Sequence, residues 1–130
     1  MSARIQVVSF GYGHHDDPAA DITVDIRRRV YDPHLAPELR HLTGLDSEIR
    51  DRVADFPGVR GLVGDAFRMA VSLAGLGAES VTVAFGCVGG RHRSVVLAEL
   101  LHLRAVAAGW VTGVEHRHID RPVLPRKEDP

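Results

Sequence analysis

The sequence has few of the residues that build cross-linked, metal-rich or membrane-spanning proteins. Its 130 residues include a single cysteine, Cys87, which excludes an internal disulfide and a cysteine-rich zinc site. No apolar stretch approaches the ~20 residues needed to cross a bilayer. Residues 1–10 lack the apolar run of a signal peptide. We therefore expect a cytoplasmic protein with no membrane partner.

An excess of charge of one sign is also missing, because the chain carries 16 basic and 17 acidic residues and a formal net charge of −1. A near-neutral chain does not hold a long polyanion by charge excess alone, although a local basic patch is not excluded. Lysine occurs once, at Lys127, and the other basic residues are arginine. Arginine binds phosphate and carboxylate bidentately, but a high-GC genome produces the same bias.

What the sequence does contain is an alternation of strand-like and helix-like segments. This alternation is typical of an α/β fold with three layers and a mainly parallel sheet of about four strands. We expect one domain over residues 1–120 and a flexible tail over residues 121–130. Apolar runs predict strands at 4–10, 21–26, 81–85 and 111–116, and helical spacing predicts helices at 47–55, 59–76 and 94–108.

A glycine-rich loop connects the third predicted strand to the last predicted helix. In such sheets, ligands bind beyond the carboxyl ends of the strands. Gly89 and Gly90 let successive N–H groups converge into an anion-binding nest, and the start of a helix adds partial positive charge. Arg93 can fold over this nest, and Ser94 can cap the helix or bond the anion. The loop therefore predicts a site for a phosphate-sized dianion, and the alternative is a glycine turn that faces solvent.

The same loop matches the pattern Cys-x5-Arg-Ser, from Cys87 to Ser94. It resembles the phosphate loop of cysteine-dependent phosphatases, in which the cysteine attacks the phosphoryl group and the arginine binds it. Gly86 stands where those enzymes usually have histidine, and no aspartate is singled out as the general acid. A phosphatase using Cys87 and Arg93 is thus one alternative, and a small buried cysteine at a strand end is another.

A second resemblance covers nearly the whole chain. The stretches VSFGYG (8–13), DITVDIR (21–27), DPHLAPELRHLTGLD (32–46), FGCVGGRHRSVVLAE (85–99) and VEHRHID (114–120) are similar, in order and spacing, to the C-terminal domain of the RapZ family of RNase adapter proteins. The Arg-x-Leu-Thr-Gly-Leu-Asp element at residues 40–46 is particularly distinctive.

The resemblance implies a fold related to a sugar-phosphate-binding subdomain of phosphofructokinase. It also implies a regulatory protein that senses glucosamine-6-phosphate, binds small RNA and helps to build an oligomer. A dianion would then be bound by a nest and an arginine, while a carboxylate and an imidazole would bind hydroxyl or amino groups. Carried over by position, the phosphate-binding residues would be Gly89, Gly90, His92 and Arg93, with Ser94 beside them, and the sugar-binding residues would be His34, Asp25 and Arg27.

The chain also departs from the family. Val88 stands where the family has threonine, which removes a hydroxyl donor. No Gly-x4-Gly-Lys-Ser/Thr motif occurs, so nucleotide hydrolysis in the family's manner is not expected, and we expect no cofactor. The lysine-rich RNA-binding tail is reduced to Arg121, Arg126 and Lys127, offset by neighbouring acidic residues, which weakens RNA binding as a prediction.

Two histidine-containing segments allow more than one interpretation. The segment GHHDD at residues 13–17 has metal-ligating side chains. However, an irregular loop does not fix the distance and angle between adjacent imidazoles, so a solvated turn is favoured. His116 and His118 alternate at the last predicted strand and are expected on one side of it. A polar sheet face is favoured there over a metal pair or an RNA contact, so we expect no metal.

The sequence as a whole favours a non-catalytic domain that binds a phosphorylated amino sugar in a regulatory role. The alternatives are the cysteine-dependent phosphatase and an RNA-binding adapter module.

Overall fold

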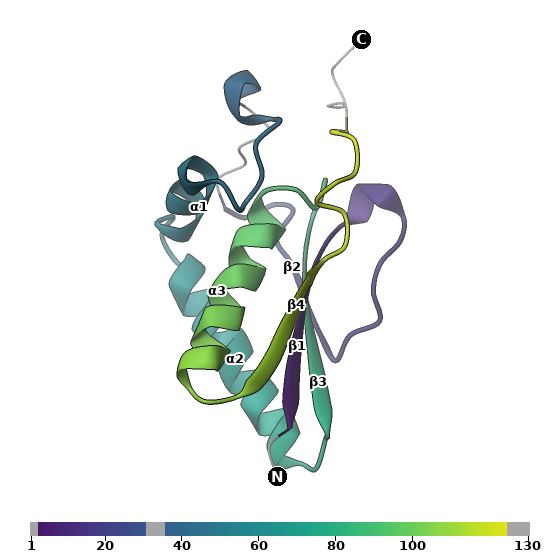
Figure 1. Cartoon of the computed structure of the whole chain (residues 1–130), viewed down its shortest axis with the longest axis vertical. Helices are drawn as coiled ribbons and strands as arrows, with labels where there is room; N and C mark the ends of the chain where they lie inside the picture. The colour runs from purple at the N-terminus through teal and green to yellow at the C-terminus, as the bar shows by residue number, and fades with distance from the viewer. Residues whose placement is uncertain (1–2, 31–35, 125–130) are drawn as a thin grey trace.

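A computed structural model describes residues 3–30 and 36–124 of the chain (Figure 1). Strands and helices alternate along it, as the sequence predicts. The strands are β1 (Arg4–Gly11), β2 (Ile22–Asp25), β3 (Ser80–Cys87) and β4 (Val111–His116). The helices are α1 (Ser47–Ala54), α2 (Val59–Gly75) and α3 (Arg93–Ala107), with short 3-10 turns η1 (Tyr12–His14) and η3 (Pro37–Leu39).

The four strands form one parallel sheet in the order β2-β3-β1-β4. Strand β1 lies inside the sheet, with Arg4 opposite Ser80 of β3 on one side and Val111 of β4 on the other. Because every pair is parallel, all four carboxyl ends reach the same edge of the sheet. The expectation of an α/β fold with a mainly parallel sheet of about four strands is confirmed.

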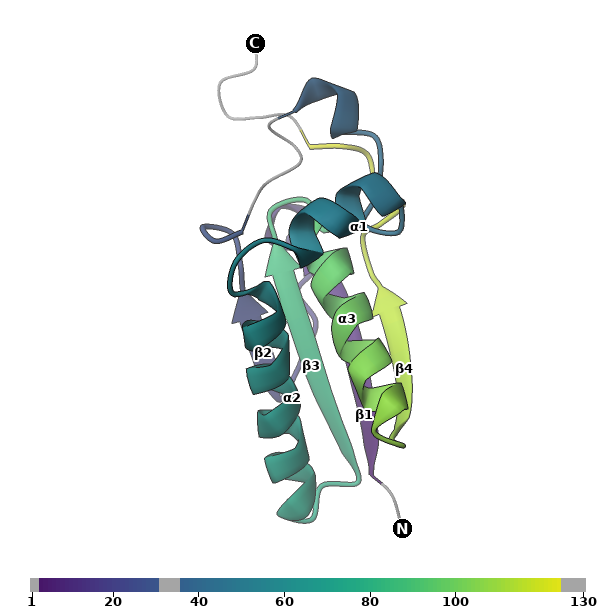
Figure 2. The same ribbon diagram turned by 90° about the vertical axis from the view of Figure 1, so that its left-hand side faces the viewer.

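The two faces of the sheet have different covers, and together with the sheet they make three layers (Figures 1 and 2). Side chains alternate along β1, so Ile5 and Val7 point into the main core beneath the helices, while Val8 and Phe10 point to the other face. Tyr12 and the connection that follows it cover this second face.

The helices bury apolar residues at helical spacing against the sheet. In α2 the buried side chains include Val59, Val63, Ala66 and Ala70, which recur every three or four residues and so share one face. Helix α3 lies beside α2 on the same side of the sheet (Figure 2). No helix in the described residues is long and apolar enough to span a membrane.

Candidate functional site

The loops that follow the four strands meet at the carboxyl edge of the sheet. Backbone hydrogen bonds join them: the Ile26 N–H donates to the Gly86 carbonyl, and the Gly13 N–H donates to the Val88 carbonyl, both at 2.9 Å. The glycine-rich loop after β3 therefore lies between the segments that follow β1 and β2. This edge is the place where parallel α/β sheets bind ligands.

Gly11 and Gly90 pack backbone against backbone at the centre of this edge. A Cβ atom on Gly11 would lie 2.4 Å from the Gly89 carbonyl carbon, and one on Gly90 would lie 2.5 Å from the Gly11 nitrogen. Gly90 also has φ +70°, which favours glycine. By contrast, a Cβ on Gly89 would meet no atom of the described residues within 4 Å. The loop is thus tightly packed at Gly90 and open at Gly89.

Arg93 connects the start of α3 to the segment after β2. Its Nη1 atom donates to the carbonyl oxygens of Ile26, Arg27 and Arg29, at 3.1 to 3.2 Å, and the residue is 4 % exposed. The sequence predicts that this guanidinium folds over the glycine loop to bind an anion. In the described contacts, Nη1 binds backbone carbonyls and fixes the position of the β2 loop, and anion binding by Arg93 stays a prediction.

Cys87 lies at the buried end of β3. Its Sγ atom is 3.2 Å from the Ser94 Oγ atom and accepts a hydrogen bond from the Gly90 N–H at 3.3 Å. Both Cys87 and Ser94 are buried. An attacking thiolate must reach its substrate, so burial of the sulfur and the carbonyl contacts of Arg93 do not favour the phosphatase interpretation.

Arg91 and His92 hold the Arg-x-Leu-Thr-Gly-Leu-Asp element against the loop. Arg91 donates to the carbonyl oxygens of His41, of Leu42 at 3.1 Å and of Ile119 at 3.1 Å. The His92 Nε2 atom lies 3.0 Å from the Arg40 carbonyl oxygen. Sequence reasoning missed Arg91, because a surface arginine and one that binds distant carbonyls look alike in a sequence.

Gly44 explains why this element is so distinctive in the sequence. Its N–H donates to the Arg91 carbonyl at 2.9 Å. A Cβ atom on Gly44 would lie 2.6 Å from the His92 carbonyl oxygen and 2.7 Å from Val95 Cβ. Only glycine lets this segment approach the start of α3 so closely.

Asp25 and Arg27 form an exposed pair at the end of β2. The Arg27 Nη2 atom lies 2.6 Å from Asp25 Oδ2, its Nε atom donates to the same carboxylate, and the guanidinium carbon lies 3.8 Å from the centre of the Tyr12 ring. The hydrogen bonds from Arg27 lower the pKa of Asp25 to about 2, so the carboxylate is ionised at neutral pH. Both side chains remain nearly half exposed.

The structure thus brings most of the predicted residues to one edge. Gly89, Gly90, His92, Arg93 and Ser94 lie on the loop and the start of α3, and Asp25 and Arg27 lie on the neighbouring segment. The remaining predicted sugar-binding residue, His34, lies outside the described residues.

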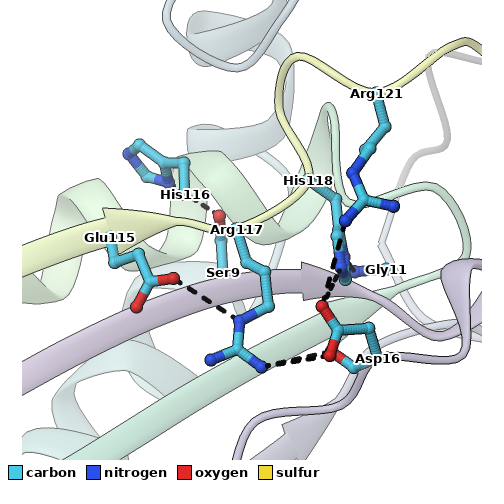
Figure 3. Close-up of polar contacts among 8 residues, drawn as sticks. All are labelled: Ser9, Gly11, Asp16, Glu115, His116, Arg117, His118 and Arg121. Atoms are coloured by element: carbon cyan, nitrogen blue, oxygen red, sulfur yellow. Dashed lines mark hydrogen bonds and ion pairs between the residues drawn. The ribbon is translucent and has the colours of Figure 1, made fainter.

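A second group of polar side chains lies beside the glycine loop, where the segments after β1 and β4 meet (Figure 3). His118 is fully buried, and its Nδ1 atom accepts a hydrogen bond from the Gly11 N–H at 2.8 Å. The His14 ring lies against it, with centroids 4.7 Å apart, and its Nε2 atom is 3.1 Å from the Gly89 carbonyl oxygen. The solvated-turn interpretation therefore holds for the exposed His15 but not for His14.

The expectation that His116 and His118 share a polar sheet face is wrong, because β4 ends at His116 and the chain then turns. His116 lies between Ser9 Oγ, 2.7 Å from its Nδ1 atom, and Glu99 Oε2, 2.8 Å from its Nε2 atom. Ser9 is fully buried, so this serine–histidine–glutamate chain joins β1, β4 and α3 and offers no nucleophile to a substrate. Within residues 3–30 and 36–124, no group of three or more acidic, histidine or cysteine side chains is arranged to hold a metal ion.

A separate hollow of about 600 Å³ lies at the opposite end of the sheet. Small residues line most of it, and Trp110 and Glu79 supply its large and charged side chains. Trp110 also packs against the main core. The hollow contains no glycine loop and no arginine, so it is not the candidate phosphate site.

Known proteins are similar to this chain over nearly its whole length. The family described as the RapZ C-terminal domain matches residues 3–120. A protein named "Nucleotide-binding protein" from Streptomyces griseus is 38 % identical over 122 residues, covering 91 % of this chain and 37 % of the relative. A protein of the same name from Acidiphilium cryptum is 40 % identical over 122 residues, covering 88 % of this chain and 39 % of the relative.

The chain therefore spans about two fifths of the length of the curated relatives that it matches. The match includes every strand and helix of the fold as well as the loops at the carboxyl edge. The chain belongs to the RapZ C-terminal domain family.

Proposed function

We propose that the domain binds a small phosphorylated ligand at the carboxyl edge of its sheet and acts in regulation. The observation that carries this proposal is the junction made by Arg93. By binding the carbonyls of Ile26 and Arg27, it holds the exposed Asp25–Arg27 pair beside the glycine loop. Arg93 thereby keeps the glycine loop, whose backbone N–H groups suit an anion, next to the exposed charges of Asp25 and Arg27.

The phosphate is assigned to the loop and to the start of α3. The first N–H groups of a helix have no partners within the helix and carry partial positive charge. His92, which precedes α3, makes no side-chain capping hydrogen bond to them. The open space above Gly89 gives a ligand access to the backbone.

The other end of the ligand is assigned to Asp25 and Arg27. An ionised carboxylate such as Asp25 pairs with the ammonium group of an amino sugar, and an arginine donates to hydroxyl oxygens or to phosphate. This chemistry supports a phosphorylated amino sugar of the glucosamine-6-phosphate type. The relatives' name introduces nucleotides as a second class of phosphorylated ligand, which the experiment below includes.

A small ligand agrees better with the charges than a long polyanion does. Arg117 and Arg121, the cations near the end of β4, both lie within 4.0 Å of an Asp16 carboxylate oxygen. Such pairing reduces the field that would attract an RNA backbone. RNA binding and assembly into an oligomer therefore rank below binding of a small ligand in this proposal.

Thermal unfolding with added compounds tests the proposal. A ligand that binds only the folded state at a hundredfold excess over its Kd adds ~2.7 kcal/mol to the free energy of unfolding. For 130 residues this raises the melting temperature by roughly 10 °C. We expect the rise with glucosamine-6-phosphate, and not with glucosamine. AMP and inorganic phosphate, tested in parallel, separate a nucleotide site and a bare phosphate site from a sugar-phosphate site.

The variant Gly89→Ala locates the site. Its methyl group meets no atom within 4 Å in the part of the chain that the structure describes, so the variant should fold normally and lose most of the ligand-induced rise. Gly75→Ala, at the other end of the domain and equally free of contacts, should keep the full rise. The proposal fails if no phosphorylated compound raises the melting temperature, or if Gly89→Ala keeps the entire effect.

A further inference from the structure

His118 is a fully buried histidine that is hydrogen-bonded to Gly11, the residue that packs against the glycine loop. Its Nδ1 atom accepts the Gly11 N–H at 2.8 Å, so in the neutral ring the proton must be on Nε2. Among the residues that the structure describes, the Nε2 atom has no hydrogen-bond partner, and Asp16 Oδ2 lies 3.5 Å away from it (Figure 3). One ring nitrogen is therefore committed to Gly11, while the other is not satisfied.

The contact with Gly11 bears directly on the loop. Gly11 packs backbone against backbone on Gly89 and Gly90, with no space for a Cβ atom on Gly11 or on Gly90. A shift of the Gly11 N–H would therefore move Gly90, whose own N–H donates to Cys87 Sγ. The His118 acceptor thus fixes the loop through one intermediate residue.

Protonation removes that acceptor. An imidazolium has an N–H on both nitrogens, so Nδ1–H and the Gly11 N–H would point at each other. We propose that His118 is a positioning residue for the glycine loop, and that protonation of its ring releases Gly11 and opens the Gly11–Gly90 contact. Given the proposed function, affinity for the phosphorylated ligand then decreases at acid pH.

The charged groups around His118 agree with a ring that is neutral at pH 7. Burial lowers its pKa most strongly, His14 and Arg121 lower it further, and Asp16 raises it. His14 faces the ring from η1, Asp16 from the segment after η1, and Arg117 and Arg121 approach the same carboxylate from the segment after β4. The acid-induced state has a ready acceptor for Nε2–H, because a small movement of Asp16 would bring it within hydrogen-bond distance.

NMR titration of the full chain tests the positioning role without any ligand. Between about pH 8 and about pH 5, the Gly11 and Gly90 amide signals should titrate with the midpoint of the His118 ring. In His118→Asn the side-chain oxygen can accept the Gly11 N–H at every pH, so the titration of both amides should disappear. In His14→Gln the titration should persist, which separates the two neighbouring imidazoles.

Ligand affinity supplies the second measurement. The phosphate group of glucosamine-6-phosphate titrates near pH 6 itself, so the quantity to compare is the wild type against His118→Asn at each pH. One pH unit below the His118 midpoint, the wild type should bind roughly tenfold more weakly than at neutral pH, beyond any loss seen in the variant.

Each result separates the two proposals. If the His118 ring titrates while the Gly11 amide does not move, or if the Gly11 titration survives in His118→Asn, the positioning role is overturned. If both amides titrate as expected and no phosphorylated compound binds at any pH, only the proposed function fails. If ligand binds with the same pH dependence in the wild type and in His118→Asn, the effect of His118 on affinity is refuted.

Discussion

Gly11→Ala tests the packing of the candidate site most directly. Gly11 has φ −120° and ψ 122°, an extended conformation that alanine adopts readily, so the backbone conformation does not disfavour the substitution. In the absence of other effects, the substitution would stabilise the protein by about 0.4–1 kcal/mol, because alanine restricts the unfolded chain. The whole cost must come from the new methyl group.

That cost is large because the colliding atoms belong to the backbone. The methyl carbon would lie 2.4 Å from the Gly89 carbonyl carbon and 2.6 Å from the Gly90 nitrogen, and neither can rotate away. Overpacking of this kind costs about 3 kcal/mol. After the gain from the unfolded chain, the net loss is about 2 kcal/mol, which lowers the melting temperature of a 130-residue domain by roughly 8 °C.

Two glycines provide matched controls in the same calorimetric or circular-dichroism melts. Within residues 3–30 and 36–124, the methyl group of Gly89→Ala meets no atom within 4 Å, and that of Gly113→Ala meets chiefly the ends of the flexible Arg4 and Gln6 side chains, at 2.4 Å and 2.9 Å. Both should melt within about 3 °C of the wild type. The reasoning is refuted if Gly11→Ala melts like the wild type, or if Gly89→Ala is destabilised as strongly as Gly11→Ala.

Three further predictions concern buried groups at the carboxyl edge. Arg93→Met removes the Nη1 donor from the carbonyl oxygens of Ile26, Arg27 and Arg29 and should lower the free energy of unfolding by about 2 kcal/mol, whereas the exposed Arg104→Met should cost under about 1 kcal/mol in the same denaturant titration. The wild type should release no phosphate from a generic aryl phosphate, because Cys87 is buried; turnover that Cys87→Ser abolishes would establish the phosphatase alternative. Finally, burial lowers the His118 pKa in the fold, so the unfolded chain binds more protons below about pH 6.5, and stability should decrease as the pH falls through that value. Urea titrations at several pH values should show this slope in the wild type and a shallower one in His118→Asn.

The fold and the location of the site follow from local patterns in the sequence. Runs of β-branched residues predict the strands, apolar spacing predicts the helices, and a glycine-rich segment between a strand and a helix predicts the loop at the carboxyl edge. Each of these signals lies within a few neighbouring residues. That is why the loop could be located, and why Asp25 and Arg27 could be placed near it.

The orientation of particular side chains could not be predicted in this way. Arg93 lies in the first turn of α3, but the carbonyls that bind it belong to a segment 64 to 67 residues earlier, and no periodicity reports such a contact. His118 is buried because the chain turns after β4, where the alternation of a strand no longer applies. The expectation for Arg93 rested on its place in the first helical turn, and that for His118 rested on strand alternation. Contacts with distant segments decide where both side chains lie.

The strand order delays folding during synthesis, because β1 must wait for the two strands that pair with it. The central strand β1 is made early, yet its neighbours β3 and β4 come late in the chain, and the Gly11–His118 hydrogen bond joins residues 107 positions apart. At about 5–20 residues per second, a ribosome takes roughly 5–20 s to synthesise that interval. Until β3 has been made, which takes up more than half of that interval, the apolar β1 strand has neither sheet neighbour to pair with. We expect the sheet to assemble only when synthesis of the domain is nearly complete, and a chain stalled before β3 to be prone to aggregation.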